Sequence, residues 1–211
     1  MTRPSPLVAA AAFATVLTLS ACSNATHQPG PASSAAAPAN ASNSPSSGPT
    51  HDDADVTFAQ QMIPHHQQAI QMSDIILAKP GIDPRVTQLA NQITAAQGPE
   101  IQMMQTWLRQ WGRPLAPTPA TPATAMPAMP GHGAMSGMMS DADMAALHNA
   151  DGPAASKLFL TQMIEHHRGA IDAAQAEISA GRNAPAVTLA RSIVASQQQE
   201  IATMQSLGAS L

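Results

Sequence analysis

The chain has 211 residues, a formal net charge of −4 and a charged fraction of 10%, so its composition does not predict a basic surface for nucleic acid. Apolar residues make up 44% of the chain, but aromatic residues make up only 2%. The single cysteine, Cys22, lies near the N-terminus, so we expect neither a disulfide nor a cysteine-based metal site in the folded part.

Residues 1–21 are typical of an export signal. Arg3 makes the start weakly positive, and the apolar stretch from Leu7 to Leu19 is too short for a convincing membrane span. The stretch ends in LSAC, which resembles the bacterial lipoprotein cleavage box. We therefore expect a lipidated Cys22 that anchors the protein to the outer face of the bacterial cytoplasmic membrane or to the cell envelope. The alternative is an ordinary secretory signal with an incidental cysteine.

Residues 22–50 are rich in Pro, Ser, Ala and Asn and have no apolar periodicity. A segment of this composition buries too little apolar surface to offset the entropy lost on ordering. We therefore predict a disordered tether that holds the folded part, residues 51–211, away from the membrane.

The folded part is an internal duplication. FAQQMIPHHQQAI, which begins at Phe58, returns about 100 residues later as FLTQMIEHHRGAI from Phe159. LANQITAAQGPEIQMM, from Leu89, likewise resembles LARSIVASQQQEIATM, from Leu189. Each half predicts a helical hairpin, at 51–112 and 141–211, on either side of a Met/Pro/Gly-rich linker at 113–140. Two hairpins form a four-helix bundle, so the predicted fold class is all-α.

Capping residues place the helices. Asp83 followed by a proline predicts a helix start, Pro185 does the same in the second half, and Ser140 with Asp143 resembles a capping box that opens a short helix. The long helices are expected over residues 53–79, 84–111, 153–180 and 185–208, with glycines at several of their ends.

The duplicated helices carry polar residues on the faces that should point into the bundle. Residues three and four apart share a helix face, which predicts an inward unit of methionine, two histidines, glutamate and methionine in each half. The units are Met62, His65, His66, Glu100 and Met104, and Met163, His166, His167, Glu200 and Met204.

Two interpretations of this unit compete. In the first, methionine fills irregular core gaps, one histidine of each pair bonds the glutamate, and the other is solvated. In the second, histidine and thioether form a soft metal site, which the repetition of the whole set favours. Cu(I) is the expected ion; zinc or Cu(II) at the histidine pairs and at the THDD stretch (His51, Asp52, Asp53) remains an open alternative.

The linker between the hairpins is rich in methionine. Proline and glycine interrupt it, so its methionines have no helical stripe on which to pack. Thioether clusters suit Cu(I) and Ag(I), which makes His132, Met135, Met138 and Met139 weaker metal candidates. The alternative is a low-complexity linker whose methionines have no role.

The doubled M-I-x-H-H-x-x-A-I motif resembles domain-of-unknown-function family 305 over about residues 51–208. The resemblance implies a ferritin-like helical fold in an exported or membrane-anchored bacterial protein, and some members are associated with copper and silver. It implies metal roles for Met62, His65, His66, Met104, Met163, His166, His167 and Met204. Glu100 and Glu200 are not implied by the resemblance; they are added to the candidate ligands only because they lie on the inward helix faces. Ala173, where the first half has Met72, departs from the duplication.

The expected function is extracytoplasmic binding of Cu(I), or of Ag(I), for sequestration, tolerance or handover. A di-iron oxidase is not expected, because Glu-x-x-His, which such bundles carry, is absent from the sequence. No nucleophile motif was found either, so no enzyme is predicted. A helical interaction module without metal is the second hypothesis. The sequence does not identify a delivery partner or an oligomeric state.

Overall fold

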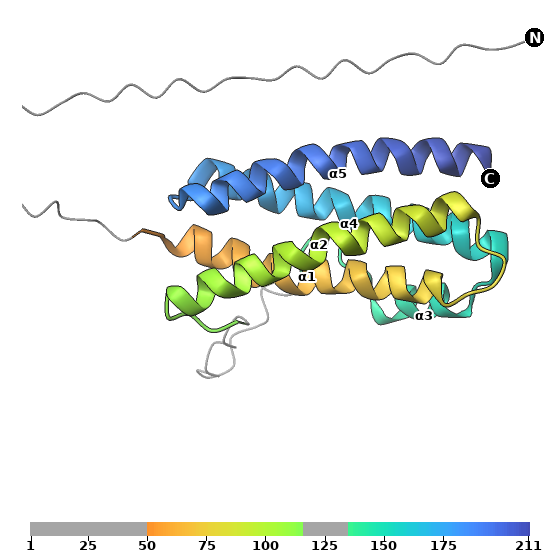
Figure 1. The fold of residues 1–211 in the computed structure, drawn as a ribbon, viewed down its shortest axis with the longest axis horizontal. Coiled ribbons are helices and arrows are strands. Elements are labelled where there is room, and N and C mark those ends of the chain that lie inside the picture. Colours follow the sequence, from red (N-terminus) through yellow and green to blue (C-terminus); the bar gives the residue numbers. More distant parts are fainter. Residues whose placement is uncertain (1–49, 116–134) are drawn as a thin grey trace, which may run out of the picture. The chain divides into compact units, whose positions relative to one another are not determined.

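The computed structural model describes residues 50–115 and 135–211 (Figure 1). The signal, Cys22, the tether up to residue 49, and His132 therefore lie outside the described residues. The described chain forms five α-helices and contains no strand, which confirms the all-α prediction. They are α1 (Asp53–Leu77), α2 (Pro84–Gln110), α3 (Asp141–Asn149), α4 (Gly152–Ala180) and α5 (Ala184–Ser210).

The predicted caps begin three of these helices. The Asp83 side chain accepts a hydrogen bond from the Arg85 amide at the start of α2, and Ser140 and Asp143 form the capping box of α3. Asn183 caps α5 just before the predicted Pro185. Side-chain acceptors at these positions satisfy amides that the first helical turn leaves without partners.

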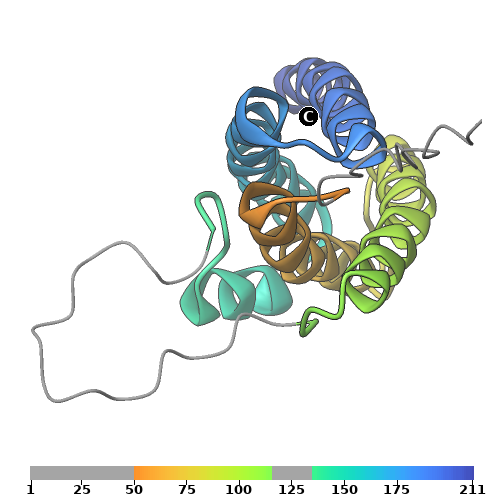
Figure 2. The same cartoon turned by 90° about the vertical axis from the view of Figure 1, so that its left-hand side faces the viewer.

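The four long helices form two antiparallel hairpins that pack into a bundle (Figures 1 and 2). α1 packs along α2, α4 packs along α5, and α1 and α4 join the hairpins. By contrast, α2 and α5 touch only slightly, and the short α3 lies on the outside against α1 and α4. The histidine-bearing helices, α1 and α4, are therefore direct neighbours.

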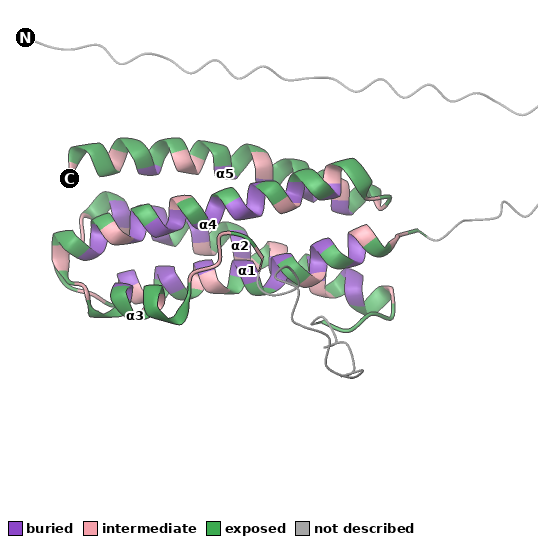
Figure 3. Ribbon diagram, turned by 180° about the vertical axis from the view of Figure 1, so that it is seen from behind, coloured by how far each residue is buried: buried purple, intermediate pink, exposed green. Residues whose placement is uncertain are grey.

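The apolar core consists of two clusters, with buried histidines on the stretches of α1 and α4 that join them. The first contains the beginning of α1, the end of α2, the end of α4 and the beginning of α5, and includes Phe58 and Met62. The second contains the opposite helix ends and includes Phe159 and Met163. Figure 3 shows how buried residues follow the inward faces of the helices. A polar layer of this kind depends on the packed apolar layers on both sides for its position.

Each long helix is amphipathic, with exposed polar residues opposite its buried face. In the part of the chain with described structure, no helix has an apolar stretch long enough to cross a membrane.

Candidate metal centre

His65 of α1 and His166 of α4 lie ring against ring where the two hairpins meet. Their ring centroids are 3.7 Å apart and their planes are inclined by 36°. Both residues are fully buried, and neither Nδ1 nor Nε2 of either ring has a hydrogen-bond partner among the described residues. Since these histidines are equivalent in the duplication, the pair marks the centre about which the two halves are arranged.

Burial keeps this inner pair neutral. It lowers the pKa of His65 to about 3, and the neighbouring His66 lowers that pKa further. The pKa of His166 falls as well, first because of burial and then because of His65. The neutral imidazole is the form that binds metal, so both rings present free lone pairs at neutral pH.

The outer two histidines are each held by a glutamate. Nε2 of His66 lies 2.7 Å from Oε2 of Glu100, and Nε2 of His167 lies 2.6 Å from Oε2 of Glu200. Both histidines are fully buried, whereas the glutamate side chains are 18% and 21% exposed. Nδ1 of each ring is buried without a partner in the described structure. A carboxylate on one ring nitrogen orients the imidazole and leaves the other nitrogen for a metal.

This arrangement changes the part that the glutamates can play. The sequence made Glu100 and Glu200 metal candidates, and its first interpretation placed one histidine of each pair on the glutamate. The structure shows this contact, whereas the other histidine of each pair, which that interpretation left solvated, is fully buried. Each carboxylate orients the ring that it contacts and fixes which ring nitrogen carries the proton.

The predicted methionines are all fully buried. Met62 and Met163 lie one helical turn before the histidine pairs, and Met104 and Met204 lie one turn after the glutamates. Within residues 50–115 and 135–211, no group of three or more His, Cys, Asp or Glu side chains is arranged to hold a metal ion. The described residues thus offer pairs of imidazoles near thioethers, not a carboxylate-rich site.

Sequence reasoning left two amides out of the site. Gln97 and Gln197 are each 3% exposed and lie one turn before Glu100 and Glu200. Neither polar atom of the Gln97 amide has a partner among the described residues. Both amides stand at equivalent positions of the duplication, and this repetition is the sequence signal that could have placed them in the predicted site.

The end of the Met-rich linker packs on the bundle. Met135 contacts the first apolar cluster and Met139 the second, and both are half-buried, as is Met138. The expectation that these methionines lack a packing surface is therefore wrong for Met135 and Met139, because their segment lies along the α1 and α4 side.

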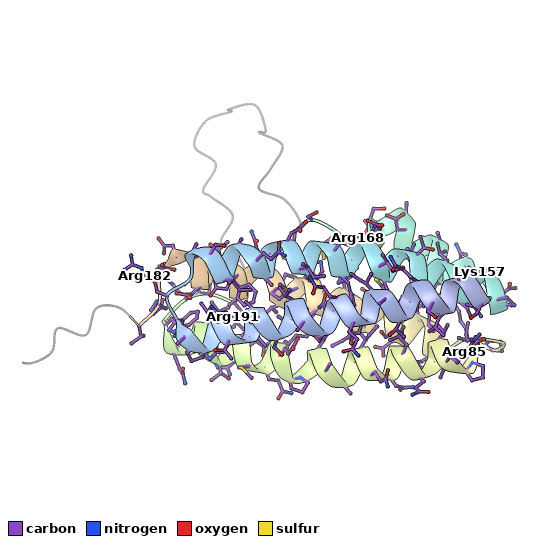
Figure 4. The ribbon with its side chains drawn as sticks, turned by 90° about the horizontal axis from the view of Figure 1, so that it is seen from above. Arg85, Lys157, Arg168, Arg182 and Arg191 are labelled. Carbon is purple, nitrogen blue, oxygen red and sulfur yellow. The ribbon has the colours of Figure 1, made fainter. Side chains whose placement is uncertain are left out.

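Five exposed basic residues lie on the surface of the bundle. Figure 4 labels them at its ends or along its outside: Arg85, Lys157, Arg168, Arg182 and Arg191. Arg168 directly follows His167 in α4, but its side chain is exposed and forms an ion pair with Glu165.

A second buried ionisable pair lies at one end of the bundle. The carboxylate of Asp55 is fully buried and accepts hydrogen bonds from the amides of Asp52, Arg182 and Asn183, at 2.6, 3.1 and 2.9 Å. Burial opposes its ionisation, but these amides and Glu177 outweigh that effect and lower the pKa of Asp55. Burial and then Asp55 raise the pKa of Glu177 to about 8. Glu177 is therefore the protonated partner at neutral pH.

This pair predicts that alkali destabilises the fold. The ordinary pKa of glutamate is 4.5, so between pH 4.5 and about 8 folded Glu177 holds a proton that the unfolded chain has lost. The resulting stability is complete below pH 4.5 and is lost as the pH rises through 8, at about 1.4 kcal/mol for each unit of pKa difference. Urea unfolding from pH 7 to pH 9, above the range in which His65 and His166 change the stability, should show this fall in the wild type and not in Glu177→Gln. Glu165→Gln, which alters an exposed glutamate, should follow the wild type; equal slopes in all three proteins would contradict the prediction.

Known proteins of similar sequence and structure identify the family. Residues 55–208 match the model of DUF305, a domain of unknown function. A proposed secreted DUF305 protein from Streptomyces coelicolor is 36% identical, with a TM-score of 0.64 over 74% of this chain and 91% of that one. A DUF305 fragment from Deinococcus radiodurans is 31% identical, with a TM-score of 0.64 over 76% of this chain and 98% of that one.

CopM is a third similar structure. In its Cu(I)-bound form it is 32% identical, with a TM-score of 0.56 over 72% of this chain and 94% of CopM. CopM has also been solved in Cu(II)-bound and Ag-bound forms. No match was found among curated proteins. The family match covers most of the chain, and the chain belongs to the DUF305 family.

Proposed function

We propose that this protein binds a soft monovalent metal ion, Cu(I) first and Ag(I) as well, at the histidines between its two hairpins. One observation carries the proposal: six buried ring nitrogens have no hydrogen-bond partner among the described residues. They are Nδ1 and Nε2 of His65 and His166, and Nδ1 of His66 and His167. A buried polar group without a partner costs about 1–3 kcal/mol, so a purely structural role does not account for the set.

The surrounding side chains favour a soft ion. Neutral imidazole and thioether together select Cu(I) over Mg(II) or Ca(II), which prefer oxygen ligands. Monovalent copper and silver accept low coordination numbers, which suits a site that offers pairs of imidazoles near buried Met62 and Met163. Glu100 and Glu200 would keep the outer histidines in the orientation that binding needs.

The similarity to CopM supports metal binding as the coarse function. CopM is described in Cu(I)-, Cu(II)- and Ag-bound forms, and it shares the fold of this chain at 30–32% identity. The choice of Cu(I), and of the histidines over the Met-rich linker, comes from the residues of this chain.

The proposed role is sequestration or handover outside the cytoplasm, without catalysis. LSAC at the end of the apolar N-terminal stretch supports a lipid anchor at Cys22. The mass of the mature N-terminal peptide would show whether Cys22 carries acyl chains. An unmodified cysteine there would rule out the anchor and leave metal binding unaffected.

Silver titration followed by NMR tests the site directly. Ag(I) is diamagnetic and does not change oxidation state, so the imidazole C–H signals of the mature protein can be followed throughout. Signals of the four buried histidines should move and saturate, while those of His51 and His148 stay in place. An anaerobic Cu(I) titration against a competing chelator should give tight binding in parallel.

Two other outcomes would decide against the proposal. Shifts confined to the methionine methyl groups of the Met-rich linker, with the buried histidine signals unchanged, would move the site to that linker. If neither ion competes with the chelator, the metal function fails and a helical interaction module remains.

A further inference from the structure

Residues 135–139, here called the strap, are fastened to α1 by a two-point contact. Nε2 of Gln68 donates to the carbonyl oxygen of Met139 at 2.9 Å, and the amide of Met139 donates to Oε1 of Gln68 at 2.7 Å. One side chain thus satisfies both backbone groups of a strap residue. Figure 3 shows this segment running beside α4 before α3 begins.

On α4 the strap is held by close backbone packing. A Cβ atom added at Gly169 would lie only 1.8 Å from the carbonyl oxygen of Ser136. Gly137 has a φ of +81°, and a Cβ atom there would lie 2.6 Å from the carbonyl oxygen of Glu165. Both contacts need glycine, because no larger residue fits without moving the backbone.

The strap lies beside the inner histidines. Gln68 follows His65 by three residues, and Gly169 follows His166 by three, so each contact is about one helical turn from an inner histidine. The Ser136 backbone is close enough to the His65 ring to oppose the fall in the pKa of His65. With the strap in place, both inner histidines are fully buried.

The strap also accounts for a break in the duplication. Gln68 and Gly169 occupy equivalent positions in the two copies of the histidine motif, yet one is a long amide and the other has no side chain. The strap meets the two equivalent positions with different parts of its backbone: Met139 lies at Gln68, and Ser136 lies at Gly169. A long amide side chain is needed to reach Met139, whereas only glycine leaves room for Ser136.

We propose that Gln68 and Gly169 are positioning residues that hold the strap as a gate over the inner histidines, and that opening of the strap limits how fast small molecules and ions reach them. For metal exchange this inference rests on the proposed function, but access itself can be measured without metal.

Two variants with matched controls test the gate in the purified full-length protein. Gln68→Ala removes both hydrogen bonds to Met139, and its control is Gln67→Ala, which alters an exposed glutamine next to it. Gly169→Ala forces the strap away, and its control is Gly98→Ala, a helical glycine where an added Cβ meets nothing within 4 Å.

Two rates are measured in the metal-free protein. Hydrogen exchange at the Met139 amide reports whether the strap has opened, and carbethoxylation by diethyl pyrocarbonate, resolved by peptide, reports access to His65 and His166. Both rates should rise about tenfold or more in Gln68→Ala, as expected on losing two hydrogen bonds. They should rise as well in Gly169→Ala, where the added Cβ atom displaces the Ser136 backbone, and stay at the wild-type value in the controls.

The gate is overturned if Met139 exchanges faster while the labelling of His65 and His166 is unchanged. It is also overturned if neither variant speeds exchange at Met139, since the strap would then not depend on these two contacts. Ag(I) release should accelerate in the same variants. A wild type that binds no Ag(I) would contradict the proposed function and leave the labelling result standing.

Discussion

Replacing His65 and His166 together with leucine is expected to abolish tight Cu(I) binding and, at the same time, to stabilise the metal-free protein. The four ring nitrogens of this pair are buried without partners in the described structure, and each such group costs about 1–3 kcal/mol. Leucine has a similar volume and no polar atom, so the free energy of unfolding should rise by at least the cost of one such group, about 1–3 kcal/mol. The affinity for Cu(I) should fall by more than about 100-fold, because losing a ligand costs more than losing its orienting partner.

Opposite changes in stability and binding distinguish a functional pair from a structural one. Urea unfolding of the metal-free proteins gives the stability, and competition with a Cu(I) chelator gives the affinity. His148→Leu, which changes an exposed histidine, should alter neither quantity much. A double variant that is less stable than the wild type and still binds Cu(I) would show that the two neighbouring rings only fill the core.

Replacing Asp55 with alanine is expected to cost about 3 kcal/mol or more of folding free energy. Its carboxylate accepts hydrogen bonds from the amides of Asp52, Arg182 and Asn183, and these donors would lose their acceptor. The variant would also remove the ionised partner of Glu177. The start of α1 and the turn between α4 and α5 should loosen together, because the hydrogen bonds from Arg182 and Asn183 to Asp55 connect them.

Asp53→Ala is the matched control for this loss. Asp53 lies two residues earlier in α1, carries the same charge, and has a side chain that is 93% exposed, with an exposed Arg113 as its partner. Exposed ion pairs contribute about 0–1 kcal/mol, so this variant should unfold close to the wild type. Similar midpoints for the two variants in urea would mean that the buried hydrogen bonds of Asp55 contribute no more than a surface charge.

The two sites use buried polar groups in opposite ways. Asp55 has an amide donor for each of its oxygens, so its burial stabilises the end of the bundle. The inner histidines have no hydrogen-bond partner among the residues that the structure describes, so their burial is costly and depends on the apolar clusters packed around them. Proteins tolerate such cost mainly at functional sites, where a ligand supplies the missing interactions.

The sequence by itself determined the helices and their order, because these depend on local signals. Apolar periodicity and capping residues placed four long helices within a few residues of their observed ends, as in α2, expected over 84–111 and observed over Pro84–Gln110. The repeat of the histidine motif predicted two equivalent hairpins and pointed to the family. It also placed the histidines, glutamates and methionines on inward faces, since facing follows from spacing along one helix.

Only the tertiary structure decided which of these residues meet. The sequence does not say which histidine of each pair meets its counterpart. In the structure His65 lies against His166, whereas His66 and His167 contact Glu100 and Glu200. Nor does the sequence show that Gln68 holds a segment some 70 residues away. The pairing of Asp55 with Glu177 was not expected at all. Each of these contacts joins separate elements, and the spacing of residues along one helix contains no information on how two helices cross or on which loop lies over them.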